Sequence, residues 1–231
     1  MRRIAALTLA AAFAASIGPT ITQGATSSAQ TWPRAGSLVR DHLIARSAPD
    51  PEAPVVRVLR QFRKDFRPQV VLATQQRIGA DGKPWDKLLL PMRPNGTVGW
   101  VPAGSISVTP RTTQIIIRRG ERRLRVYRNG RLAFTTIVAV GSKGRETPLG
   151  SFYVTARFVP DDSFLGTFAL ETSAYSKLTE WPGGGVVGIH GTSLPSLLGR
   201  AVSHGCVRVS NSAARVLERL VPLGTPVSIV P

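Results

Sequence analysis

Short apolar runs separated by turn residues fill most of this chain and restrict it to a mainly β fold. Gly, Pro, Asn and Asp interrupt the runs so often that few of them are long enough for a helix. One segment differs, because apolar residues recur at helical spacing over 216–221, after a capping residue at Asn211 or Ser212. We therefore expect a mainly β chain with one helix near the C-terminus.

The first 25 residues have the layout of a secretory signal peptide. Two arginines follow Met1, residues 4–17 form an apolar run without a charge, and small polar residues follow Pro19. We predict cleavage near Ala25, a polar tether over residues 26–32, and export to the periplasm or cell wall. The alternative is an uncleaved anchor, since the apolar run is nearly long enough to span a bilayer. Contact with the membrane is expected only in that case.

The rest of the chain divides near Pro110 into two parts. We expect a small all-β N-terminal module over 33–108 and a mostly β second domain over 112–231. In the module, apolar runs bounded by turns predict strands at 55–59, 70–73, 87–90 and 98–102. In the second domain, the same pattern predicts strands at 114–117, 123–127, 132–140, 151–159, 186–190, 207–209 and 227–230.

Two connections in the second domain are distinctive. Asn129-Gly130 lies between two predicted strands, which is a strong signal for a tight hairpin. Residues 160–185 have mixed composition and end in a glycine hinge. We interpret that segment as a long irregular connection, either a substrate-covering flap or an ordinary surface loop.

The chain is strongly basic, with a formal net charge of +17 at pH 7. The excess is shared, with +6 over residues 33–108 and +9 over residues 109–231. A basic exported protein fits anionic wall polymers, whereas export argues against nucleic acid, so we expect no nucleic-acid partner. Arg123 and Arg125 alternate with Leu124 and Val126, which favours a solvated sheet face over a dedicated polymer-binding patch.

Cys206 is the only cysteine, so it cannot form a disulfide within the chain. A free thiol in an exported protein suggests a reactive site or pairing with another molecule. A thiol attacks carbonyls as the thiolate and needs a neighbouring base, for which His190, 16 residues upstream, is the candidate. No acidic residue lies near His190 in sequence, so we expect a backbone carbonyl to orient the imidazole. Gly205 would let its own amide and that of Cys206 face a developing oxyanion.

These residues allow two other interpretations. Cys206 could be a small buried hydrophobic residue. His190, His204 and Cys206 could bind zinc, but a fourth ligand and paired-cysteine spacing are missing. We therefore expect neither a metal nor a cofactor.

The block Ser203-His204-Gly205-Cys206, with His190-Gly191 upstream, closely resembles the signature of the L,D-transpeptidase catalytic domain. The segment Thr147-Pro148-Leu149-Gly150 before a strand, and Arg208 and Asn211 after the cysteine, add to the resemblance over residues 112–230. Ser212-Ala213-Ala214 departs from relatives that carry an acidic residue there, which leaves the role of Asn211 open. Residues 33–108 resemble a bacterial Src-homology-3-like wall-binding module at 43–49 and 98–102; a spacer without a ligand is the alternative.

The resemblance implies a mostly β catalytic domain with Cys206 as nucleophile, His190 as general base and the Gly191 carbonyl as its orienter. It also implies a pocket formed by Ser203, His204 and Gly205, with Arg208 and Asn211 on the substrate side.

The implied reaction joins the third residues of two peptidoglycan stem peptides through a cysteine thioester, and carbapenem-type inhibitors would acylate the same sulfur. An L,D-carboxypeptidase or wall hydrolase using the same thioester, and a non-enzymatic wall-binding protein, remain as alternatives.

Overall fold

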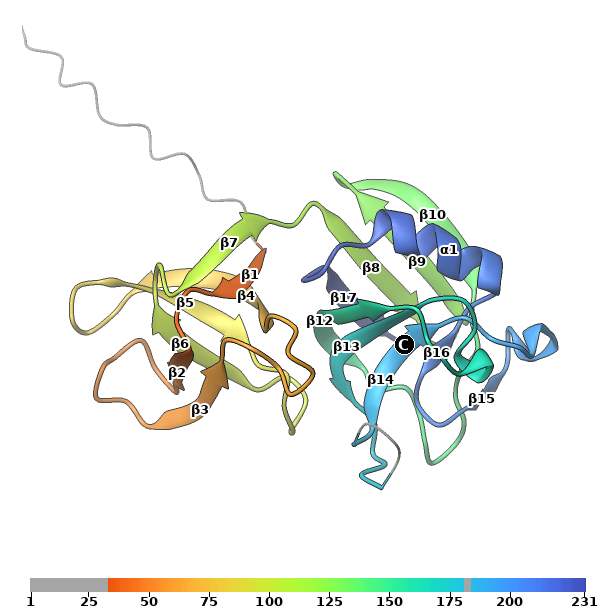
Figure 1. Ribbon diagram of the computed structural model, residues 1–231, viewed down its shortest axis with the longest axis horizontal. Coiled ribbons are helices and arrows are strands. Elements are labelled where there is room, and N and C mark those ends of the chain that lie inside the picture. The colour runs from red at the N-terminus through yellow and green to blue at the C-terminus, as the bar shows by residue number, and fades with distance from the viewer. Residues whose placement is uncertain (1–32, 181–183) are drawn as a thin grey trace, which may run out of the picture. The chain divides into compact units, whose positions relative to one another are not determined.

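The computed structural model describes residues 33–180 and 184–231. The predicted signal peptide and tether, and part of the predicted glycine hinge, lie outside these residues. The described residues belong to one compact unit, which contains two large sheets and one two-stranded sheet (Figure 1). Among the described residues, no helix is long and apolar enough to cross a membrane.

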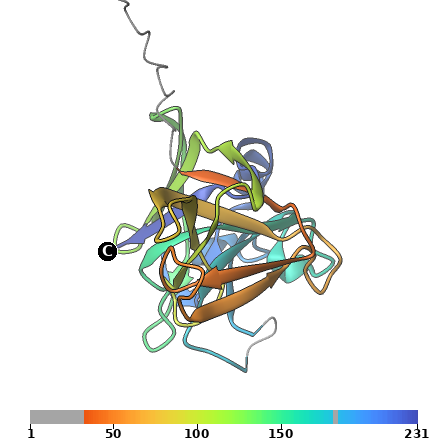
Figure 2. The same cartoon turned by 90° about the vertical axis from the view of Figure 1, so that its left-hand side faces the viewer.

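The N-terminal part forms one antiparallel seven-stranded sheet, which faces the viewer in Figure 2. Its strand order is β3-β2-β6-β5-β4-β1-β7. Its core consists of small and medium apolar side chains, with Val71, Leu88 and Val101 fully buried. The strands are β1 (Arg34–Leu38), β2 (His42–Arg46), β3 (Val55–Arg60), β4 (Val70–Ile78), β5 (Pro84–Leu89), β6 (Val98–Pro102) and β7 (Ile106–Pro110).

The C-terminal part is built on an eight-stranded sheet with the order β10-β9-β8-β17-β12-β13-β14-β16. A short parallel pair, β11 with β15, accompanies it. The strands are β8 (Thr113–Arg118), β9 (Arg123–Arg128), β10 (Arg131–Ile137), β11 (Val140–Gly141), β12 (Gly150–Phe158), β13 (Ala169–Tyr175), β14 (Val186–His190), β15 (Ala201–Ser203), β16 (Val207–Arg208) and β17 (Pro226–Val230). Two 3-10 turns, η1 (Ser163–Leu165) and η2 (Pro195–Leu197), complete it with one helix, α1 (Asn211–Leu220).

The helix packs its apolar stripe against the C-terminal sheet. Ala213, Ala214 and Leu217 are buried in the same cluster as Ile115 and Val126 of the sheet. The cap is Ser210, one residue before the predicted candidates, and its hydroxyl accepts a hydrogen bond from the Ala213 amide at 3.1 Å. The predicted helix is therefore confirmed and its predicted cap is corrected: Ser210 is the last extended residue and satisfies a free amide of the first turn.

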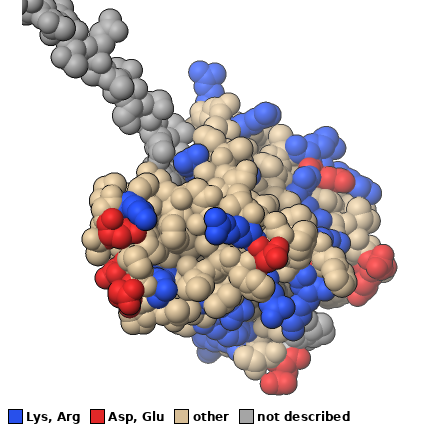
Figure 3. Space-filling model, turned by 60° about the vertical axis from the view of Figure 1, so that its left-hand side comes forward, with Lys and Arg blue, Asp and Glu red and all other residues tan. Residues whose placement is uncertain are grey.

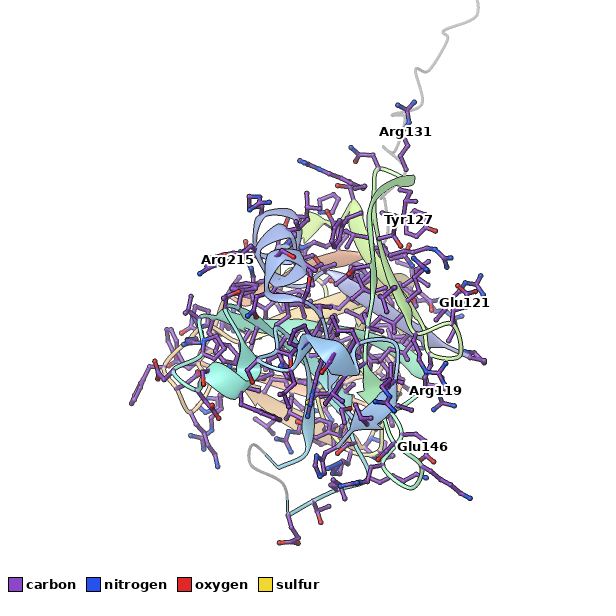
Figure 4. All side chains as sticks on the ribbon, turned by 90° about the vertical axis from the view of Figure 1, so that its right-hand side faces the viewer. Arg119, Glu121, Tyr127, Arg131, Glu146 and Arg215 are labelled. Carbon is purple, nitrogen blue, oxygen red and sulfur yellow. The ribbon has the colours of Figure 1, made fainter. Side chains whose placement is uncertain are left out.

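The β9–β10 hairpin forms as predicted. Asn129 and Gly130 have positive φ values of 50° and 75°, which suit the tight turns that join twisted antiparallel strands. Figure 4 places Arg131 at the tip of the hairpin and Tyr127 further along it. Leu124 and Val126 are fully buried, so the apolar face of β9 is the predicted one.

The basic residues of the sheet face take part in local ion pairs. Arg125 and Arg118 contact Glu121 at 3.0 and 3.5 Å, and these side chains are well exposed. Over the face shown in Figure 3, Lys and Arg side chains are spread out, with Asp and Glu among them. Both observations support a solvated charged surface here.

Two predicted segments differ in the structure. The expected long strand over 132–140 ends at Ile137, because Ala139 pairs with Arg208 and Val140 with Ala201 after a change of partner. The expected irregular connection over 160–185 contains β13, a central strand between β12 and β14. Its sequence, ALETSAY, has small and hydroxylated side chains, so no continuous apolar run marked it.

A third buried cluster connects the two sheets. Tyr153 of β12 is fully buried and packs with Val70, Leu72 and Leu89 of the N-terminal sheet. The Arg63 guanidinium of the N-terminal part also forms a two-pronged ion pair with Glu171 of β13, at 2.7 and 2.9 Å. The N-terminal sheet is therefore fixed to β12 and β13, and β13 is the neighbour of β14 in the C-terminal sheet.

Candidate active site

Parallel pairing of β14 and β16 brings together the two sequence-predicted reactive residues. Ile189 pairs with Val207 and His190 with Arg208, and the two strands lie side by side in Figure 1. Ile189 and Val207 are buried apolar residues, so core packing holds the register. Cys206 immediately precedes β16 and therefore lies beside the end of β14 that carries His190.

The Cys206 sulfur lies next to the backbone of β14. The Gly188 amide donates a hydrogen bond to Sγ at 3.3 Å. A Cβ built on Gly188 would lie 4.0 Å from this sulfur and 3.7 Å from Cδ2 of the His190 ring. The sulfur and the imidazole ring thus both lie within 4.0 Å of one position beside Gly188. The Cys206 residue as a whole is partly exposed.

The His190 ring is held by the neighbouring backbone. Only 3% of the residue is exposed, and its Nδ1 lies 2.6 Å from the Gly191 carbonyl oxygen. A carbonyl can only accept, so Nδ1 carries the proton, and in the neutral ring Nε2 carries the lone pair. The Gly191 carbonyl is in the position that sequence reasoning assigned to the orienting group.

Burial affects the two reactive groups in opposite directions. It lowers the pKa of His190 to about 4, and the positive charge of Arg208 lowers it further, while backbone hydrogen bonds to Gly191 and Leu165 oppose this. Burial raises the pKa of the Cys206 thiol, against the effects of the Gly188 amide and Arg208. At neutral pH the resting pair is therefore a neutral thiol beside a neutral imidazole. A thiol that attacks as the thiolate would therefore have to lose its proton during the reaction, because burial disfavours the charged form.

The turn before the nucleophile is fixed by Ser203. Its hydroxyl donates to the Cys206 carbonyl at 2.6 Å and accepts from the Gly205 amide at 3.1 Å. Gly205 has a φ of +120°, and a Cβ there would lie 2.8 Å from Cβ of Ser176, so a side chain has neither room nor an allowed backbone. The amide of Gly205 is engaged here, and acting as an oxyanion donor would require it to leave this bond. The Gly188 amide, which sequence reasoning missed, is the donor that reaches the sulfur.

Thr147 holds the same turn from the opposite side. The residue is fully buried, and its hydroxyl donates to the Gly205 carbonyl at 2.8 Å and accepts from the Gly141 amide at 2.9 Å. The Thr147-Pro148 turn therefore shapes the nucleophile loop through a bond between residues that lie 58 positions apart in the sequence.

Replacing Thr147 with valine should destabilise the protein by about 1–3 kcal/mol, because it leaves a buried amide and a buried carbonyl without partners. Urea unfolding measures this change. Thr135→Val, on the exposed face of β10, is the matched control and should stay within about 0.5 kcal/mol of the wild type. Equal stability of Thr147→Val and the wild type would contradict the bracing role of this hydroxyl.

Asn211 braces the loop after β14. Its Oδ1 accepts from the amides of Thr167 and Thr192, both at 3.2 Å. A Cβ on Gly166 or Gly191 would lie 2.2 or 2.3 Å from this oxygen, so both glycines are needed for the close approach. Sequence reasoning placed Asn211 on the substrate side, whereas here its oxygen is used by the protein backbone.

Arg208 is a buried cation beside the nucleophile. Only 6% of it is exposed, and its guanidinium carbon lies 4.6 Å from the centre of the Phe164 ring. Its Nε is buried without a hydrogen-bond partner among the described residues. Burial lowers the pKa of Arg208. The pKa of the partly exposed His204 is also lowered, by burial and by the positive charges of Arg145 and Arg208. This arrangement offers a cationic donor to an anionic group entering the site.

Comparison with known proteins places these residues in a family. Residues 112–229, slightly more than half of the chain, match the family profile of the L,D-transpeptidase catalytic domain. This chain belongs to the L,D-transpeptidase family. YkuD of Bacillus licheniformis, assigned as an L,D-transpeptidase, is 33% identical over 165 residues, which cover 68% of this chain and 94% of that protein. The family resemblance predicted from the cysteine motif is thereby confirmed.

Solved L,D-transpeptidases are more distant. A mutant of the Enterococcus faecium enzyme is 22% identical, with a TM-score of 0.41; the match covers 54% of this chain and 55% of that one. LdtMt1, an LD transpeptidase solved in complex with imipenem, is 18% identical, with a TM-score of 0.42; the match covers 64% of this chain and 90% of that one. This chain spans about half the length of the E. faecium enzyme. The family assignment rests on the sequence matches.

Burial of a neutral His190 makes this L,D-transpeptidase family member sensitive to acid. The unfolded chain binds a proton near pH 6.5 and the folded protein only near pH 4, so stability is fully present above pH 6.5 and is lost as the pH falls toward 4. The expected loss from this group is about 3 kcal/mol. Urea unfolding at several pH values measures it, and His190→Gln should have a flatter profile. Identical profiles for the two proteins would contradict a buried neutral imidazole.

Proposed function

We propose that this protein joins two peptidoglycan stem peptides through a thioester on Cys206. Family membership supports this class of reaction. The observation that carries the proposal is the position of the Cys206 sulfur, which accepts a hydrogen bond from the Gly188 amide and lies with the His190 ring around one position beside Gly188. The imidazole is neutral, and its Nδ1 is held by the Gly191 carbonyl, so Nε2 is available to accept a proton.

In the first half-reaction, the thiol proton passes to Nε2 of His190 as Sγ attacks the carbonyl carbon of the third stem residue. The carbonyl oxygen becomes an oxyanion, and backbone amides near the sulfur are suited to stabilise it. When the oxyanion collapses, the bond to the terminal D-alanine breaks. The imidazolium returns its proton to the leaving amine, which leaves a thioester and a neutral histidine.

In the second half-reaction, the side-chain amine of the third residue of another stem attacks the thioester. His190 takes a proton from this amine, and the carbon–sulfur bond breaks as the new amide bond forms. The sulfur is then protonated, which restores the resting thiol. The buried Arg208 cation, with its unpartnered Nε, would hold a carboxylate of one peptide in this cycle.

The neutral resting pair has a consequence for this mechanism. A neutral thiol survives in an oxidising compartment better than a thiolate, since the thiolate is the reactive form. Transfer of the thiol proton to His190 would accompany attack on a bound substrate carbonyl. The thiol is then activated mainly when substrate is present.

Carbapenem-type compounds are the proposed inhibitors. LdtMt1 was solved in complex with imipenem. We expect the Cys206 sulfur of this chain to open the lactam ring in the same way that it attacks a stem carbonyl. Stem peptides and possible anionic wall polymers are therefore the proposed partners, and both require the export that the leader predicts.

Two alternative functions share parts of this site. If water replaces the acceptor amine, the same thioester gives an L,D-carboxypeptidase or wall hydrolase, and the Cys206 residue is partly exposed. A non-enzymatic wall-binding protein would instead use the basic surface and the N-terminal sheet. The wall-binding, Src-homology-3-like identity of that sheet is part of the proposal.

Product analysis separates these functions. Purified protein is incubated with disaccharide–tetrapeptide muropeptides, and the products are resolved by liquid chromatography and mass spectrometry. Dimers linked through their third residues support cross-linking, and trimmed monomers alone would favour the carboxypeptidase. If the wild type and Cys206→Ala both leave the muropeptides unchanged, the result supports the wall-binding interpretation and contradicts the enzymatic one.

A further inference from the structure

A loop of the N-terminal module binds the backbone of a segment next to the nucleophile. Arg93 donates hydrogen bonds to the carbonyls of Ser176 at 3.0 Å, Leu178 at 3.2 Å and Gly184 at 3.0 Å. Its guanidinium carbon also lies 4.8 Å from the centre of the Tyr175 ring. Arg93 therefore binds three backbone carbonyls, and its guanidinium also packs on an aromatic ring.

The same loop makes a second set of contacts with the start of that segment. The Asn95 side chain donates to the Tyr175 carbonyl at 2.8 Å and accepts from the Tyr175 amide at 2.9 Å. The Tyr175 hydroxyl donates to the Pro91 carbonyl at 3.1 Å. This reciprocal pairing imitates a strand partner at the end of β13, so residues 91–95 act as a clamp on residues 175–180 and on Gly184, which are the clamped segment.

The clamped segment forms one wall of a groove beside the nucleophile loop. The groove has a volume of about 860 Å³, and residues 146–149 line its other side. Both walls contact Gly205, the residue before Cys206. Thr147 bonds to its carbonyl at 2.8 Å, and Ser176 packs against its Cα so closely that a Cβ would lie 2.8 Å away.

The clamped segment leads directly into the strand that carries His190. It turns back on itself, with the Ser176 amide bonded to the Gly185 carbonyl at 2.8 Å. A Cβ on Gly185 would lie 1.9 Å from the Leu178 carbonyl oxygen, so the turn is closely packed. Hydrogen bonds from Arg93 and Asn95 add to this packing and restrict the described residues 175–180 and 184 to one conformation.

We propose that the clamp fixes this wall for the peptide substrate of the proposed reaction, and that Arg93 is a positioning residue. The N-terminal module then contributes to the active site itself, in addition to any wall binding. The proposal rests on the proposed function, because the substrate it names is the stem peptide. Releasing the wall would leave the Cys206–His190 pair in place and widen the groove in which a peptide must be held.

Arg93→Ala and Asn95→Ala test the proposal, with Arg40→Ala as the matched control on an exposed turn of the same module. For each variant, KM and kcat are measured with a donor tetrapeptide, and Cys206 alkylation by iodoacetamide is followed. We expect both clamp variants to lose on the order of 10-fold to 100-fold in kcat/KM, mainly through a higher KM. Alkylation of Cys206 should stay unchanged, and hydrogen exchange should rise at residues 175–180.

The readouts separate positioning from a purely structural role. If alkylation of Cys206 and turnover fall together, or if KM stays at the wild-type value, the proposal is overturned. Arg93→Lys sharpens the test, since a single ammonium cannot reach three carbonyls with the geometry of a guanidinium and should rescue little. Should Arg93→Ala fail to fold, Asn95→Ala, at an exposed residue, carries the test alone. Absence of turnover in the wild type would reject the proposed function, whereas wild-type turnover in the clamp variants would reject only the clamp.

Discussion

Cys206→Ser should lower turnover of stem peptides by at least about 10³-fold, the largest effect expected for any single substitution here. Serine keeps the volume and a hydroxyl, but its proton is far harder to remove, and a buried neutral His190 is too weak a base for that step. The measurement is the initial rate of dimer formation from purified muropeptides. The Gly188 amide that bonds to sulfur would still have an acceptor, so the fold should remain.

The matched control for this substitution is chemical. Cys206 is the only cysteine, so any adduct of a thiol reagent on the wild type reports this residue alone. Intact-mass measurement after imipenem treatment should show an adduct on the wild type and none on Cys206→Ser. Turnover of Cys206→Ser near the wild-type rate, with a normal unfolding curve, would show that the sulfur is not the nucleophile.

His190→Gln should lower the rate of acylation by about 10²-fold to 10⁴-fold, because the thiol loses its proton acceptor. Glutamine resembles the ring in size and can still donate to the Gly191 carbonyl, so the loss should come from the missing base rather than from misfolding. Stopped-flow acylation by imipenem measures the rate. Raising the pH should partly restore acylation, since hydroxide can then ionise a thiol whose pKa is raised by burial.

Two other histidines serve as controls for this assignment. His42→Gln, at an exposed position of the N-terminal sheet, should leave acylation unchanged. His204→Gln lies two residues from the nucleophile and should have a smaller effect than His190→Gln, because its ring is not part of the Gly188 contact. If His204→Gln lost more of the acylation rate than His190→Gln, His204 rather than His190 would be the base.

Local sequence signals were enough for most of the fold. Apolar runs bounded by turns marked most strands of the sheets, and Asn129-Gly130 marked the hairpin because it supplies two positive φ angles. The missed central strand β13 has mainly small and hydroxylated residues, so it lacks the continuous apolar run that marked the other strands. The break after Ile137 was missed because Ala139 and Val140 change partners to residues over 60 positions away, which no local pattern records.

The residues of the candidate site likewise include some that the sequence predicts and some that it does not. Cys206, His190 and the orienting Gly191 carbonyl could be named from residue chemistry and the family motif. Gly188, Thr147 and Asn211 act through contacts that depend on the register of β14 with β16 and on loops that meet only in the folded chain. The protonation state of the pair also lay beyond the sequence, because it depends on how dry the site is. A glycine two residues before the histidine on the same strand was the one local signal for the missed amide donor.

The most direct measurement of the central claim is the site of the covalent intermediate. Wild-type protein is mixed with a donor tetrapeptide lacking an acceptor amine, quenched in acid, digested and mapped by mass spectrometry. We predict that the acyl group is found on the peptide that contains Cys206 and is released by hydroxylamine, as a thioester would be. Turnover with no adduct on that peptide, or an adduct on another residue, would contradict the account.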